Sequence, residues 1–187
     1  MKPIKGTIKI VDKIEIVVRR KDGSIKSKHI INNGLFHRIL VKLGLKHDSM
    51  TNIGFAQVAA FLLADIDVDH STYTNCNWIS IGTGIIGADP TDTALGTPKG
   101  IRQAGVGTRV TTGGITNNTA QLVATFSQAI DVTLTGVNAI TEVGMFWDVS
   151  AGNSMLLRQV YSPSDNCDWD QQDSMQVTIK VQVKQGS

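Results

Sequence analysis

Apolar and polar residues alternate most regularly near the C-terminus of the chain. From residue 175 to residue 184 every second residue is apolar: Met175, Val177, Ile179, Val181 and Val183 alternate with Gln, Thr and Lys. Because successive side chains of a strand point to opposite faces, one face of this segment is apolar and the other is solvated. The pattern predicts a β-strand that contributes one face to the core.

The same period of two recurs elsewhere along the chain. Isoleucines at positions 4, 8, 10, 14 and 16 lie among charged residues, and the Asp22-Gly23 turn signal follows them. This region is therefore predicted to form two strands joined as a hairpin. Further strands are predicted over 78–81, 119–127, 140–147 and 155–161. A parallel sheet would need crossover helices between these later strands, so the pattern predicts a mainly β fold, an antiparallel β-sandwich that is jelly-roll-like.

Two short helices are predicted in the N-terminal third. Apolar residues recur at spacings of three and four over 35–43, after the capping sequence 32–34, and again over 55–66. The chain is thus predicted to be a single domain, 1–187. Residues 1–70 would supply the strand hairpin and both helices, and residues 71–187 the sandwich strands.

The stretch 82–114 shows no regular apolar pattern and is rich in Gly, Thr and Pro. It carries Lys99, Arg102 and Arg109, and no acidic residue occurs between Asp92 and Asp131. A loop of this length inside a compact domain is usually functional or ordered by a partner. We therefore expect 82–114 to be a long loop whose three cations meet acidic groups of a neighbouring subunit.

Composition narrows the class of protein. With 187 residues, 41% hydrophobic and 18% charged, the chain can bury a globular core. A net charge of +2 is too small to imply a nucleic-acid partner by itself, and none is predicted. The most basic stretch, 13–28, interleaves its charges with Ile and Val, which favours a solvated strand face over phosphate binding. The longest apolar stretch, 55–63, is too short to span a bilayer, and the N-terminus does not read as a secretory signal, so no membrane association is expected and synthesis in a cytoplasm is predicted. Cys76 and Cys167 are expected to be free thiols in a reducing cell, or to be bridged after release.

Candidate chemistry is sparse. Residues 82–87 form a GxGxxG sequence, but a turn-forming segment follows and no acid stands where a ribose ligand is needed, so no cofactor is predicted. The acidic run Asp65, Asp67, Asp69 and His70 lacks the glycine and the final acid of a calcium loop, and no metal is predicted. There is no GxSxG elbow, and the only glutamates are Glu15 and Glu142. No catalytic residue is assigned, and the chain is predicted not to be an enzyme.

Two charged residues interrupt apolar strands. Glu142 lies within one predicted strand and Arg158 within the next. On neighbouring antiparallel strands they are expected to pair across the sheet as a stabilising device. Trp147 and Trp169 are expected to be core or interface anchors, although exposed tryptophans would suit sugar binding.

Several short motifs occur in a fixed order: Ile81-Gly82-Thr83-Gly84, Asp92-Thr93-Ala94-Leu95-Gly96, Ile140-Thr141-Glu142-Val143-Gly144, and Leu156-Leu157-Arg158. This layout resembles structural (virion) proteins of tailed bacteriophages and archaeal tailed viruses, in an IGTG…DTALG…ITEVG…LLR order that spans nearly the whole chain. The group usually has an acid after the Ala-Leu-Gly and an arginine pair beyond it. In this chain Thr97-Pro98-Lys99 follows the Ala-Leu-Gly, and Arg102 and Arg109 are separated. The contacts of this loop are therefore the feature that the resemblance predicts least well.

The resemblance implies a non-enzymatic virion structural protein, assembled in the host cytoplasm. An auxiliary capsid or decoration protein that stabilises the particle surface is favoured, because the chain has neither a fibrous repeat nor a coiled-coil stalk. A tail, collar or tail-fibre component, or a module that recognises a host-surface glycan, is the alternative. The expected partners are copies of the chain itself, as a homo-oligomer for which a trimer is the first expectation, and other virion proteins such as the major capsid or tail protein.

Overall fold

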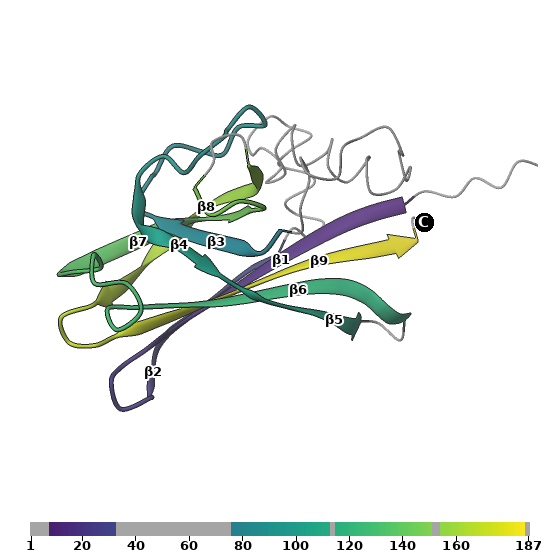
Figure 1. Ribbon diagram of the computed structural model, residues 1–187. Coiled ribbons are helices and arrows are strands. Elements are labelled where there is room, and N and C mark those ends of the chain that lie inside the picture. Colours follow the sequence, from purple (N-terminus) through teal and green to yellow (C-terminus); the bar gives the residue numbers. More distant parts are fainter. Residues whose placement is uncertain (1–7, 33–75, 113–114, 151–153, 186–187) are drawn as a thin grey trace, which may run out of the picture.

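The computed structural model describes residues 8–32, 76–112, 115–150 and 154–185, and the fold of this part is mainly β (Figure 1). These residues form nine strands and no helix. The strands are β1 (Ile8–Arg19), β2 (Ile25–Asn32), β3 (Trp78–Gly82), β4 (Pro98–Ala104), β5 (Val106–Thr112), β6 (Ile115–Ser127), β7 (Val137–Phe146), β8 (Met155–Asp168) and β9 (Ser174–Gln185). Both helices predicted from the sequence lie outside the described residues, as does the acidic run 65–70. No helix capable of crossing a membrane occurs in the described part.

The strands form two antiparallel sheets. One sheet, here called sheet A, has the strand order β2-β1-β9-β6-β5, and the other, sheet B, has the order β4-β3-β7-β8. The predicted N-terminal hairpin is present as β1 and β2, and β1 also pairs with β9 along its whole length. The hairpin is therefore an integral part of the main sheet.

The predicted C-terminal strand is central to sheet A, where β9 lies between β1 and β6. Ile179 is paired with Ile14 on one side and Leu122 on the other, and all three side chains are buried. The alternation seen in the sequence thus places one face of β9 against sheet B. The main core is made of such residues from both sheets, among them Val18, Phe126, Met175, Ile81, Val143 and Leu157, together with Trp169 from the β8–β9 turn.

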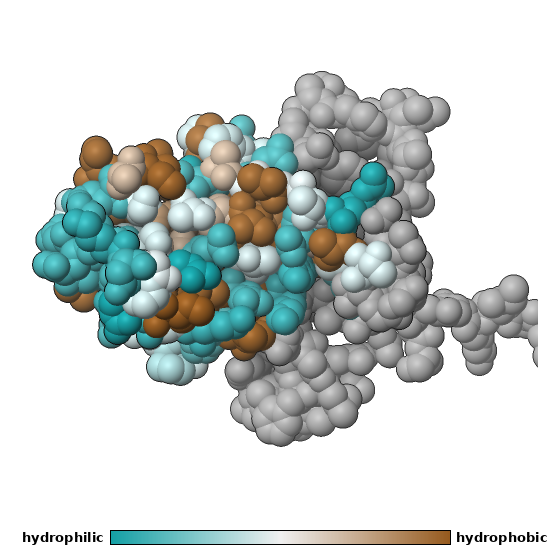
Figure 2. Space-filling view, turned by 90° about the horizontal axis from the view of Figure 1, so that it is seen from below, coloured by the Kyte–Doolittle hydropathy of each residue, from teal (hydrophilic) through white to brown (hydrophobic). Residues whose placement is uncertain are grey.

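The opposite face of sheet A is polar. Lys13 and Lys180 are cross-strand neighbours there, and Lys28 forms a 2.8 Å ion pair with Glu15. Seen from below, the described surface is mostly hydrophilic with scattered apolar residues (Figure 2). This face follows the usual division of an antiparallel sheet into a packed side and a solvated side.

The prediction of one long loop over 82–114 is wrong. Pro98–Ala104 forms β4 at the edge of sheet B, and Val106–Thr112 forms β5 at the edge of sheet A. Most β4 side chains are exposed or only partly buried, so no alternation of apolar residues marks the strand. Edge strands pair on one side only and need little apolar sequence, which explains why the pattern was absent. The segment between strands is therefore confined to 83–97.

Candidate functional site

The most unusual side chain of the fold is Glu142, a fully buried carboxylate in the middle of β7. Its neighbour Val143 points into the main core, so Glu142 points to the face of sheet B that is turned away from sheet A. Segment 83–97 covers this face: its Leu95 packs against Phe146 and Met155 in a second, smaller apolar cluster. Glu142 thus lies beneath the loop.

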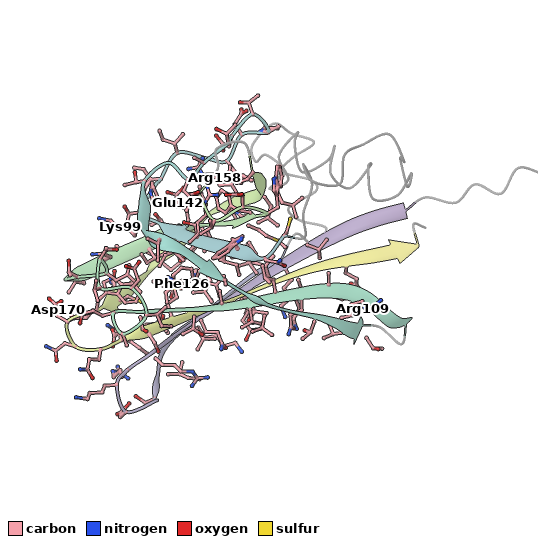
Figure 3. The ribbon with its side chains drawn as sticks, viewed as in Figure 1. Lys99, Arg109, Phe126, Glu142, Arg158 and Asp170 are labelled. Carbon is pink, nitrogen blue, oxygen red and sulfur yellow. The ribbon has the colours of Figure 1, made fainter. Side chains whose placement is uncertain are left out.

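Five hydrogen bonds converge on the Glu142 carboxylate. The backbone N–H groups of Gly84 and Thr97 donate to Oε1 at 2.9 and 2.8 Å, and that of Gly96 donates to Oε2 at 3.0 Å. Arg158 donates to Oε2 through Nε at 2.9 Å and Nη2 at 2.7 Å. Because Gly84 and Gly96-Thr97 stand at opposite ends of the loop, one carboxylate fastens both ends. Figure 3 shows Glu142 and Arg158 beneath this loop.

Arg158 fastens the middle of the same loop. It lies on β8 opposite Gly144, two residues along β7 from Glu142, so the two side chains are diagonal neighbours on one face. Its Nη1 donates to Asp92 Oδ2 at 2.8 Å, and its Nη2 also donates to the carbonyl oxygen of Ile86 at 3.2 Å. Asp92 Oδ2 in turn accepts the N–H of Asp89 at 2.8 Å, which closes a tight turn. The ion pair expected from the sequence is therefore present and holds the loop as well as the sheet.

Close approach explains two glycines of the loop. A Cβ atom on Gly84 would lie 2.5 Å from Glu142 Oε1, and one on Gly96 would lie 2.9 Å from Arg158 Nη2. Both distances are too short for a side chain at either position. The first part of the GxGxxG sequence, Gly82 to Gly84, is thus shaped for contact with a buried carboxylate of the protein itself.

The ionised groups of this site stabilise one another. Burial opposes ionisation of Glu142, but the hydrogen bonds from the loop amides and from Arg158 outweigh it and hold the pKa of Glu142 below its ordinary value. Burial also opposes the charge of Arg158, and the two carboxylates of Asp92 and Glu142 overcome it and raise the pKa of Arg158. A carboxylate that accepts five hydrogen bonds and has no exposed surface offers no free position to a substrate. Its role is to hold the loop.

No protein-family model, no curated protein and no solved structure matches this chain. The buried pair of Glu142 and Arg158 holds a loop that carries two adjacent isoleucines. Ile85 is 80% exposed and Ile86 is 79% exposed. They are the most exposed large apolar residues in the described part of the chain. The loop 83–97 is fixed on its inner side and exposes two isoleucines to solvent.

The three cations expected at an interface are dispersed. Arg102 on β4 donates to the Asp148 carbonyl at 2.7 Å and to Ser154 Oγ at 2.8 Å, and its guanidinium stacks 3.7 Å from the centre of the Phe146 ring. Arg102 is therefore engaged within its own subunit. Lys99 is half-exposed on β4, and Arg109 is exposed at the far end of sheet A (Figure 3).

The ion pair could be predicted from the sequence, but its hydrogen-bond partners could not. Asp92 and the amides of Gly84, Gly96 and Thr97 come from a segment read as unstructured, and their convergence depends on the fold. The sequence signal for these partners was the combination of glycines with Asp92 in 82–96, because these residues belong to the motifs of the virion-protein resemblance.

Asp131 is a second anchor that the sequence did not reveal. It accepts the N–H of Ile101 at 2.7 Å and the N–H of Thr133 at 2.9 Å, which ties the β6–β7 connection to β4.

Other candidate groups have structural positions. Trp169 is fully buried in the core and offers no platform for a sugar, and Trp147 is half-buried. Cys76 and Cys167, the two cysteines of the chain, are not joined by a disulfide in the structure. Within the described ranges, no three His, Cys, Asp or Glu side chains come together as metal ligands.

Proposed function

We propose that this chain is a non-enzymatic structural protein of a tailed-virus particle, which works by assembling with copies of itself and with other virion proteins. The observation that carries the proposal is the exposed pair Ile85 and Ile86 on a loop that a buried ion pair fixes in position. The motifs of the virion-protein resemblance supply this arrangement: Gly84, Asp92, Gly96, Glu142 and Arg158 all belong to it.

The energetics of the loop support an assembly role. Removing two charged groups from water is costly, and ordering backbone costs roughly 1–2 kcal/mol per residue. A fixed loop is of no advantage to a monomer that needs only solubility, whereas a preformed contact surface lowers the entropic cost of association. Burial of each isoleucine against a partner would contribute about 1.5–3 kcal/mol. We infer that the tip of the loop is the apolar centre of a subunit contact.

The proposal changes the interface expected from the sequence. Loop 83–97 supplies its centre, and Lys99, on the strand that follows the loop, is a candidate charge at its rim. Arg109 would belong to a separate contact at the other end of sheet A, and Arg102 acts within the subunit. The partner surface is a second copy of the chain, and a closed ring such as a trimer would bury every copy of the loop.

We also propose that the two sheets form a β-sandwich of jelly-roll-like type. Connections β4 to β5, β6 to β7 and β8 to β9 each pass from one sheet to the other, which supports a sandwich of jelly-roll-like type. Compact β-sandwich modules suit a particle surface, so an auxiliary capsid or decoration protein is our first choice. A tail or collar component would use the same contact surface and is the second.

The test is the oligomeric state of a double variant, Ile85→Ser with Ile86→Ser. By sedimentation velocity, the wild-type chain is expected to form a discrete oligomer and the double variant a folded monomer. The matched control is Ile25→Ser with Ile30→Ser on β2, residues that are 53% and 43% exposed and lie away from the loop. The control should remain oligomeric. A monomeric wild-type chain at the highest accessible concentration would contradict self-assembly.

A further inference from the structure

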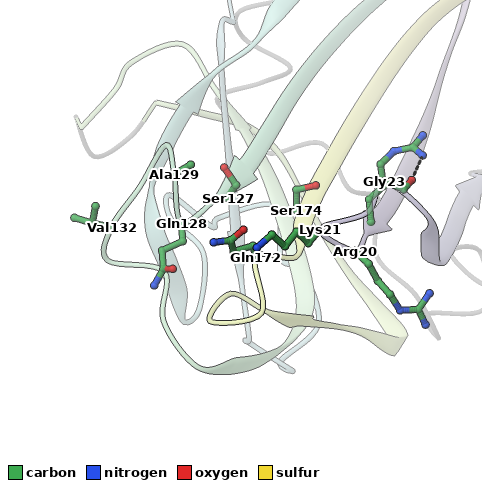
Figure 4. A pocket seen from close by; sticks show the side chains of 10 residues that line it. Arg20, Lys21, Gly23, Ser127, Gln128, Ala129, Val132, Gln172 and Ser174 are labelled. Carbon is green, nitrogen blue, oxygen red and sulfur yellow. Dashed lines mark hydrogen bonds between the residues drawn. The ribbon is translucent and has the colours of Figure 1, made fainter.

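A separate cavity of about 690 Å³ lies at the end of sheet A, where three connections meet. Its walls come from the β1–β2 turn, from the segment that follows β6, and from the β8–β9 turn (Figure 4). The ion pair of Glu142 and Arg158 is not part of it. The volume is in the range of pockets that hold small molecules, between about 300 and 1,000 Å³.

The register of sheet A builds one side of this cavity. Ser174 at the start of β9 is paired with Arg19 at the end of β1 and with Ser127 at the end of β6. Neighbouring strands are about 4.8 Å apart, so a guanidinium and two hydroxyl groups stand in one row. Val18, Met175 and Phe126 occupy the preceding row and point into the core, which turns the row of Arg19, Ser174 and Ser127 outward.

The cavity is strongly basic. Arg19, Arg20 and Lys21 line it together with Gln128 and Gln172, and none of the described lining residues is acidic. Arg19 uses Nη1 for the Gly23 carbonyl at 3.2 Å, which leaves its other N–H groups available. The side chain of Lys21 extends toward Gln172, between Ser174 and the Arg20 side of the cavity (Figure 4). Asp22 lies near Arg20, and Asp168 and Asp173 line the hollow on the far side of Arg20 and Lys21. The cavity itself presents three cations and no acid, which favours an anion there.

One wall of the cavity has an uncommon backbone. Gln172 has a φ of 62°, in the left-handed region that residues other than Gly, Asn and Asp rarely adopt. The turn is held there by the N–H of Gln172, which donates to the Trp169 carbonyl at 2.9 Å, and by Asp173, which accepts the N–H of Asp168 at 2.9 Å. Strained residues of this kind gather at ligand sites, where surrounding contacts maintain them. The turn places the amide side chain of Gln172 at the cavity wall.

We propose that this cavity binds a small hydroxylated ligand that bears an oxyanion, such as a sugar acid or a sugar phosphate. The oxyanion would lie between Arg19, Lys21 and the hydroxyl of Ser174, where charged and neutral donors converge. Ligand hydroxyls would bond to Gln128 and Gln172. The proposal does not depend on the assembly role, because the cavity and loop 83–97 share no residue.

The ligand chemistry follows from the donor set. Serine hydroxyls, amides and cations make charge-assisted and neutral hydrogen bonds to oxygen atoms, and the lining contains no aromatic ring to favour a flat apolar ligand. Ala129 and the 78% exposed Val132 supply a small apolar edge that suits the C–H face of a sugar ring. Carboxylate and phosphate groups satisfy the same donors, and separate probes distinguish them.

The test is a calorimetric titration of the full chain with glucuronate, with glucose 1-phosphate and with glucose. We expect saturable binding of at least one anion and binding of glucose that is at least about tenfold weaker, the loss expected for one charge-assisted contact. Preference for glucuronate would identify a carboxylate ligand, and preference for glucose 1-phosphate a phosphate ligand. Absence of saturable binding of both anions would overturn the proposal.

Two variants locate the binding. Lys21→Gln and Ser174→Ala should each weaken binding of the preferred anion, the first by about tenfold because a charged donor is lost. Lys180→Gln removes the same charge from the polar face of sheet A, outside the cavity, and should leave the affinity unchanged. Equal losses in Lys21→Gln and Lys180→Gln would show nonspecific attraction and refute the site. Thermal unfolding of each variant checks that the fold is retained.

Discussion

Arg158 donates two hydrogen bonds to the same oxygen of Glu142, at 2.9 Å from Nε and 2.7 Å from Nη2, with side chains only 4% and 0% exposed. Glu142 and Arg158 are not directly opposite each other on β7 and β8. They meet diagonally, since Arg158 stands opposite Gly144. This leaves Oε1 of Glu142 free for the amides of Gly84 and Thr97. One ion pair therefore joins two strands to a loop that lies about 50 residues earlier in the chain.

Removing one partner of this pair should be strongly destabilising. Arg158→Met leaves a buried carboxylate without its counter-charge, and we expect a loss of about 3–5 kcal/mol in the free energy of unfolding. The matched control is Lys28→Met, which breaks the more exposed 2.8 Å pair with Glu15 and should cost no more than about 1 kcal/mol. Urea denaturation measures both. Equal losses in the two variants would contradict the special role of the buried pair.

The glycines of the loop provide a steric test. Gly84→Ala brings a Cβ to 2.5 Å from Glu142 Oε1, and we expect it to cost about 1–3 kcal/mol, as overpacking does. Gly87→Ala lies in the same loop, where a Cβ meets no atom within 4 Å, so its stability should be close to that of the wild type. Thermal unfolding of the two variants separates contact with the carboxylate from general loop rigidity. A harmless Gly84→Ala would refute the close approach.

Stability should depend on pH through Glu142. Its pKa in the folded chain is held below the ordinary value of 4.5, so the ionised carboxylate stabilises the fold above that pH and the contribution is lost as pH falls below it. The unfolding free energy of Glu142→Gln should therefore fall less steeply than that of the wild type between about pH 5 and pH 3. Parallel curves for the two proteins would show that Glu142 does not titrate as described.

Cys167 should be chemically inert in the folded chain. Burial, followed by the nearby charge of Asp173, raises the pKa of the Cys167 thiol to about 12, so almost no thiolate exists near neutral pH. In a Cys76→Ser background, a maleimide reagent should label the native protein very slowly and the urea-unfolded protein rapidly. Rapid labelling of the native protein would mean that this part of the core opens readily.

The sequence predicted those strands that contribute an apolar face to the core. β9 had the clearest pattern because it is the central strand of sheet A, with one face in the core and the other solvated, so its apolar and polar residues alternate without a break. β4 and β5 were missed because edge strands with exposed Gly, Thr and Lys side chains carry no such signal. For segments 33–75 and 1–7, which include both predicted helices, the sequence prediction stands untested.

Only the charged centre of the site, the pair of Glu142 and Arg158, could be predicted from the sequence. Glu142 and Arg158 stood out because each is a charge inside an apolar strand. The donors around them are mostly backbone amides, which every residue except proline possesses, so their position follows from the tertiary fold alone. Arg102 shows the converse: its charge suggested an interface, but Phe146 and the carbonyl of Asp148 engage it inside the subunit. Residue type indicates the capacity to interact, and the fold selects the partner.

We infer that loop 83–97 is formed within each subunit and is then presented for assembly. Amide hydrogen exchange at Gly84, Gly96 and Thr97 tests it most directly, measured in the assembled wild type and in the monomeric Ile85→Ser, Ile86→Ser variant. Because Glu142 of the same chain accepts all three N–H groups, we expect strong protection in both proteins. Protection in the assembled protein alone, with fast exchange in the monomer, would show that a partner orders the loop and that the loop is not preformed.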